Sequence, residues 1–87
     1  MILGQHEMVK QRVQKICAQL NEFRLLVTRI FWSYQDKRPK MTFAISPECG
    51  MHQLCDFVIA VAHLHSSEES HGEPFHFVYV PELLVQS

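Results

Sequence analysis

The chain has 87 residues, 47% of them hydrophobic, and a formal net charge of −1, which excludes a disordered chain and indicates one globular domain, residues 1–87. A chain this short buries only roughly 60% of its unfolded surface, so its many apolar residues suggest that some are buried against a partner. The longest apolar run without a charge, residues 57–67, is too short and too polar to span a membrane, and the first 20 residues lack the apolar segment of a secretory signal.

Residues 5–35 carry the strongest pattern in the chain. Apolar residues follow each other at alternating spacings of four and three, and no Gly or Pro interrupts them between Gly4 and Pro39. This seven-residue repeat predicts one long amphipathic helix. The repeat comprises Val9, Val13, Ile16, Leu20, Phe23, Val27, Ile30 and Tyr34.

The predicted length of this helix indicates a partner. About 30 residues at ~1.5 Å each span about 45 Å, whereas a compact domain of this size has a diameter of roughly 30 Å. One end should therefore extend past the domain and contact a second copy or another protein. The alternative is a break near Asn21, with both pieces packed internally. The residues expected to bind the partner are Phe23, Leu26, Val27, Ile30, Phe31, Trp32, Tyr34, Lys37 and Arg38.

The rest of the chain alternates between strand and helix patterns. Alternating apolar positions predict two strands. Ser46 and Pro47 are residue types that begin a helix, and an apolar stripe follows them. The predicted elements are a strand over residues 40–46, a helix over residues 47–65 and a strand over residues 75–80.

The predicted fold class is therefore α+β, with a long N-terminal amphipathic helix followed by a strand–helix–strand unit. This order suits a crossover between two parallel strands. Two strands are marginal as a sheet, so we expect the sheet to be completed or covered in a dimer. The tail, residues 82–87, is expected to add a turn or to pair at an edge.

The charges divide unevenly along the chain. Residues 1–45 hold all eight Lys and Arg against three acids, a net charge of +5, whereas residues 46–87 hold six acids and no Lys or Arg. Such a division indicates either a basic docking face or two halves that attract each other.

The three cysteines are an odd number without the spacing of a disulfide framework, so we expect reduced thiols and a cytoplasmic protein. Met41–Cys55 locally resembles the strand, active turn and helix of the thioredoxin family, with Cys49-Gly50-Met51-His52 in place of CxxC. The resemblance covers some 40 residues, through Val80, and lacks that family's proline-bearing loop and closing hairpin. It implies a redox-responsive thiol at Cys49, whose place at a helix start favours the thiolate.

Two other kinds of site have candidate residues. Zinc takes four N or S ligands, and the candidate ligands are Cys49, His52, His71 and His76. Nucleic acid is the other candidate, because Lys37, Arg38 and Lys40 cluster near two aromatic residues, although the sequence pI of 6.6 does not favour it.

The function predicted from the sequence is protein binding without catalysis. No catalytic constellation or cofactor motif is present, and short chains with large apolar faces commonly act by covering a partner's surface. We therefore expect a homodimeric regulator, inhibitor or adaptor in the cytoplasm, with no cofactor. The alternatives are a Cys/His metal-binding or thiol-redox-responsive regulator and a nucleic-acid-associated regulator that uses the basic first half.

Overall fold

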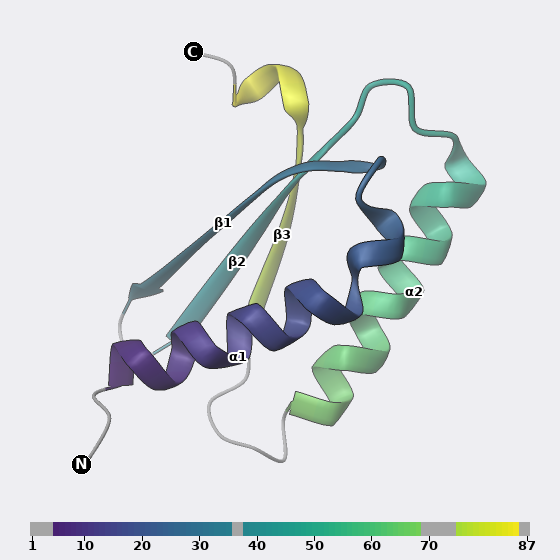
Figure 1. Cartoon of the computed structure of the whole chain (residues 1–87). Helices are drawn as coiled ribbons and strands as arrows, with labels where there is room; N and C mark the ends of the chain where they lie inside the picture. Colours follow the sequence, from purple (N-terminus) through teal and green to yellow (C-terminus); the bar gives the residue numbers. More distant parts are fainter. Residues whose placement is uncertain (1–4, 36–37, 69–74, 86–87) are drawn as a thin grey trace.

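A computed structural model describes residues 5–35, 38–68 and 75–85 of the chain. The described residues form a small α+β domain of two helices and a three-stranded sheet (Figure 1). Neither helix is long and apolar enough to cross a membrane. The elements are α1 (Gln5–Gln19), η1 (Asn21–Phe23), β1 (Val27–Gln35), β2 (Arg38–Ile45), α2 (Met51–Glu68), β3 (His76–Pro81) and η3 (Glu82–Leu84).

The predicted helix over residues 5–35 is wrong beyond Gln19. The helix closes with the Leu20 N–H bonded to the Ile16 carbonyl at 3.0 Å, and the short turn η1 leads into strand β1. The break near Asn21 lies where the alternative prediction put it, but a strand follows it instead of a second helical piece. Six of the nine residues of β1 are β-branched or aromatic, and such side chains fit a pleated sheet better than a helix.

This strand also corrects the predicted order of elements. The sheet has the order β1-β2-β3, with β1 antiparallel to β2, and β2 parallel to β3. The chain thus supplies its own third strand, from within the segment predicted to be helical. The two parallel strands are connected by α2, and the tail forms the turn η3.

The second helix begins later than predicted, at Met51 instead of Pro47. Ser46 does accept a backbone hydrogen bond, but from Glu48 at 3.2 Å in a turn before the helix. Gly50 is the residue that caps the helix: its N–H donates to the Gln53 side chain at 3.0 Å, and its carbonyl accepts the first helical hydrogen bond.

Both helices pack against one face of the sheet. The stripe on α1 predicted from the repeat is buried there, and it meets Phe43 of β2 and Phe57 of α2. These two rings lie edge to face, with 5.2 Å between their centroids. The buried core consists of Val9, Val13, Ile16, Leu20, Leu26, Met41, Phe43, Phe57, Val61 and Phe75.

Replacement of Phe57 by alanine is expected to lower the free energy of unfolding by about 3–5 kcal/mol, because the lost ring leaves a cavity between α2 and β2. Phe57 is fully buried, whereas Ile59 on the same helix is 55% exposed. Ile59→Ala is the matched control and should change stability by less than about 0.5 kcal/mol. Urea unfolding measures both variants, and similar losses for the two would contradict this core.

Candidate functional site

The segment predicted to bind a partner is now divided between core and surface. Leu26 is only 8% exposed, and the Phe23 ring lies edge to face on Phe57, so both residues belong to the core. Val27, Trp32 and Tyr34 pack partly against the core, whereas Ile30, Phe31 and Arg38 are exposed. Lys37 lies outside the described residues.

Strand β1 forms an edge of the sheet. It has nine residues, Arg29 is its one charged residue, and it contains no proline. No described strand lies beyond it. Thr28 is displaced by a shift in register, and its hydroxyl donates a hydrogen bond to the Ala44 carbonyl at 3.3 Å, which fixes the start of the strand. From Arg29 to Gln35 the pairing with β2 is regular, so the register shift is confined to the start of the strand.

The two helices lie on one face of the sheet, and alternate side chains of the strands point to the opposite face. Cross-strand partners share a face, and Trp32, Met41 and Phe77 belong to the covered side. Their neighbours along each strand therefore point to the other side, which we name the open sheet face. Its residues lie in three rows across the sheet, Ser33–Lys40–His76, Phe31–Thr42–Val78 and Arg29–Ala44–Val80, with Arg38 at the end of β2.

The open sheet face is basic. It carries Arg29, Arg38 and Lys40, and none of its described residues is Asp or Glu. The Arg29 guanidinium lies over the Phe31 ring, 4.8 Å from the centroid. Arg29, Phe31 and Arg38 are exposed on this face and Lys40 is half-buried, whereas Ala44 is fully buried.

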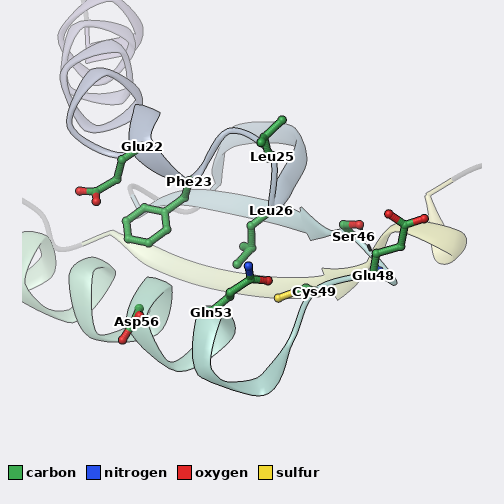
Figure 2. A pocket seen from close by; sticks show the side chains of 9 residues that line it. All are labelled: Glu22, Phe23, Leu25, Leu26, Ser46, Glu48, Cys49, Gln53 and Asp56. Carbon is green, nitrogen blue, oxygen red and sulfur yellow. Dashed lines mark hydrogen bonds between the residues drawn. The ribbon is translucent and has the colours of Figure 1, made fainter.

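A hollow of about 350 Å³ lies at the opposite side of the sheet, beside the turn between β2 and α2 (Figure 2). The carboxyl ends of parallel strands are common places for ligands. In Figure 2 the Cys49 sulfur points toward Gln53, whereas Leu25 points away from the hollow. Three carboxylates line it, and their negative charge opposes binding of an anion there: Glu22, Glu48 and Asp56.

Cys49 is not at the third position of a helix, as the sequence predicts, because α2 begins after it. Its thiol donates a hydrogen bond to the Gly50 carbonyl at 3.3 Å. The described part of the thioredoxin-like segment therefore keeps the strand, the turn and the helix, but places the thiol one residue before the helix cap.

The candidate metal ligands are not brought together. His76 pairs with Lys40 at the start of β3, while Cys49 follows the other end of β2, so roughly 16 Å of strand separates the two positions. His52 is exposed on the first turn of α2, and His71 lies outside the described residues. Within residues 5–35, 38–68 and 75–85, no group of three or more His, Cys, Asp and Glu is placed to hold a metal ion.

The most perturbed titratable groups lie in the core layer. Burial raises the pKa of the Cys17 thiol and of the Tyr79 hydroxyl. Cys17 borders a small hollow of about 190 Å³ between α1 and β1, which Ile30 also lines. Cys17 and Cys49 are half-buried and Cys55 is exposed, and all three are free thiols.

The free energy of unfolding is expected to fall as the pH rises above about 9. The pKa values of Cys17 and Tyr79 are raised above the ordinary 9.0 and 10.0, so the unfolded chain loses these protons before the folded chain does. Their contribution is complete below the unfolded pKa and is lost as the pH rises through the folded pKa. Urea titrations across this range should show a shallower loss in Cys17→Ala than in the wild type.

Cys55→Ala is the control for this pH dependence, because it removes an exposed thiol. Its stability should follow the pH in the same way as that of the wild type. If the free energy of unfolding falls with pH identically in Cys17→Ala and Cys55→Ala, this alkaline loss cannot be assigned to the half-buried Cys17 thiol.

Comparison of the chain with protein-family models, with curated proteins and with solved structures finds no match. Two surfaces of the described residues remain as candidates for binding: the edge of β1 and the open sheet face. The hollow beside Cys49 is a third feature of the described residues that bears on function.

Proposed function

We propose that the chain is a small non-enzymatic interaction protein that works as a homodimer, in which the β1 strands of two copies pair edge to edge. The observation that carries this proposal is the long edge strand itself, nine residues with one charge and no proline. As a regulator, inhibitor or adaptor, the dimer acts by presenting its surface to a partner protein. Its three free thiols support a cytoplasmic location.

Edge strands in stable monomers are normally protected from pairing. The usual devices are a very short strand, lysine or proline on the edge, and a bulge that twists the edge away. In β1 the register shift lies at the first residues only, between Val27 and Arg29, and the rest of the strand has none of these devices. An edge strand without such devices is a template for pairing with a strand of a second copy.

The side chains of β1 suit antiparallel pairing about a two-fold axis. With the axis at Phe31 or Trp32, Arg29 of one copy lies opposite Ser33 or Gln35 of the other, so the strand brings no like charges face to face. The result is a six-stranded sheet, which is within the usual size range of sheets. The exposed part of Ile30 then becomes buried near the axis.

Because the paired segment includes Val27, Ile30, Phe31, Trp32 and Tyr34, the proposal keeps most of the residues predicted to bind a partner. It changes the way in which they bind. A helix would present them as one stripe, whereas a strand presents its backbone edge and places alternate side chains on opposite faces. The interface therefore depends more on main-chain hydrogen bonds than on a hydrophobic seam.

Replacement of Ile30 by lysine is expected to give a folded monomer. The Ile30 side chain is 38% exposed at the edge of β1, so the lysine ammonium can reach water in the monomer but would lie against Trp32 or Tyr34 of the other copy in the dimer. Sedimentation equilibrium at micromolar concentration should give twice the chain mass for the wild type and the single chain mass for Ile30→Lys.

Ile59→Lys is the matched control, because it makes the same change at an exposed site on α2. This variant should remain dimeric, and circular dichroism should show that both variants are folded. A wild-type chain that sediments as a monomer, or a folded Ile30→Lys variant that stays dimeric, would overturn the proposed pairing.

A further inference from the structure

We propose that the open sheet face binds single-stranded nucleic acid, with phosphates held by Arg29, Arg38 and Lys40 and a base stacked at Phe31. This site is separate from the edge of β1 and does not depend on dimerisation.

The charge of the open sheet face differs from that of the whole chain, which is weakly acidic. None of the described acids belongs to a strand: they lie on α1, in the turns η1 and η3, beside Cys49 and on α2. Charges farther apart than about 8 Å are largely screened at physiological ionic strength, so the local charge decides which ligand approaches. Three cations without an acid on the same face attract a polyanion.

Phe31 is the aromatic residue of the open sheet face. It is 38% exposed in the middle row, and the Arg29 guanidinium lies 4.8 Å from the centre of its ring. Proteins that bind single strands stack bases on aromatic rings and on arginine planes, which tolerates any base. The Arg29–Phe31 pair offers both kinds of surface at one place.

The spacing of the rows on the open sheet face suits a single strand. Arg29 and Lys40 lie in the outer two of the three rows, and Phe31 lies in the row between them. The two outer rows are four residues apart, which is about 13 Å along the strands. A strand of nucleic acid that crosses the face can therefore place a base on the ring and phosphates on both sides of it. The hydroxyls of Ser33 and Thr42 lie in these rows as further hydrogen-bonding groups.

Other occupants fit the face less well. A second copy stacked on it would bring three cations against three cations, which opposes association. Duplex DNA is read by elements that enter a groove, and this face has no projecting helix or ribbon among the described residues. An acidic peptide would match the charge but would leave the Arg29–Phe31 stacking surface unused.

The test uses fluorescence anisotropy with labelled oligouridylate and oligothymidylate of equal length. Each phosphate contact on a single strand contributes roughly −0.7 to the slope of log affinity against log salt, so three contacts give a slope of about −2. Arg29→Ala and Lys40→Ala should each weaken binding and reduce the slope by about 0.7. Phe31→Ala should weaken binding roughly tenfold and leave the slope unchanged.

Three controls make the result specific to this face. Lys10→Ala and Lys15→Ala remove exposed cations of α1 and should leave the affinity unchanged. Polyglutamate of the same charge should compete poorly, because it cannot stack. Ile30→Lys and Ile59→Lys should bind the oligonucleotides equally well, since neither residue lies on the open sheet face, so a failure of the dimer and a failure of this site are told apart.

Several results would overturn the proposal. One is the absence of binding at low salt by the folded wild-type chain. Another is equal weakening by Lys10→Ala and Lys40→Ala, which would indicate a diffuse attraction. A third is competition by polyglutamate as strong as that by oligouridylate, which would assign the face to an acidic protein instead.

Discussion

The packing of both helices on one side of β2 is the constraint on which the rest of the structure depends. Phe43 lies at the centre of this packing, with the rings of Phe57, Phe77 and Tyr79 within 5.9 Å of its own centroid. Both α-helices among the described residues lie on this side, so neither of them covers the opposite face of the sheet. The open sheet face is thus a consequence of the core and not an independent feature.

The central position of β2 also determines which strands are edges and which cations meet. With β2 at the centre, β1 and β3 are both edges, and the hairpin of β1 and β2 brings Arg29, Arg38 and Lys40 onto the open sheet face. The carboxylates near the β2–α2 turn lie beside the helical layer, which also holds Lys10 and Lys15 of α1. The division of charge along the sequence is therefore only partly a division between faces.

The sequence predicts the later elements well and the segment after Gln19 badly. Alternation in residues 40–46 and 75–80 predicts strands where β2 and β3 lie, and the stripe of α1 fits a helix up to Leu20. In β1, however, Val27, Ile30 and Tyr34 continue the spacing of four and three by coincidence, and the strand preference of its β-branched and aromatic residues was outweighed by the repeat. The open sheet face could not be predicted, because Arg29 and Lys40 meet only through the register of the hairpin, and the same register separates His76 from Cys49.

Amide hydrogen exchange of residues 27–35, followed by NMR in dilute and in concentrated protein, tests the central claim that this segment is a free edge strand. The account predicts that alternate amides, those bonded to β2, are protected in dilute protein, and that the intervening amides gain protection as the concentration rises. Uniform protection of consecutive amides at both concentrations would indicate a helix and would contradict the account.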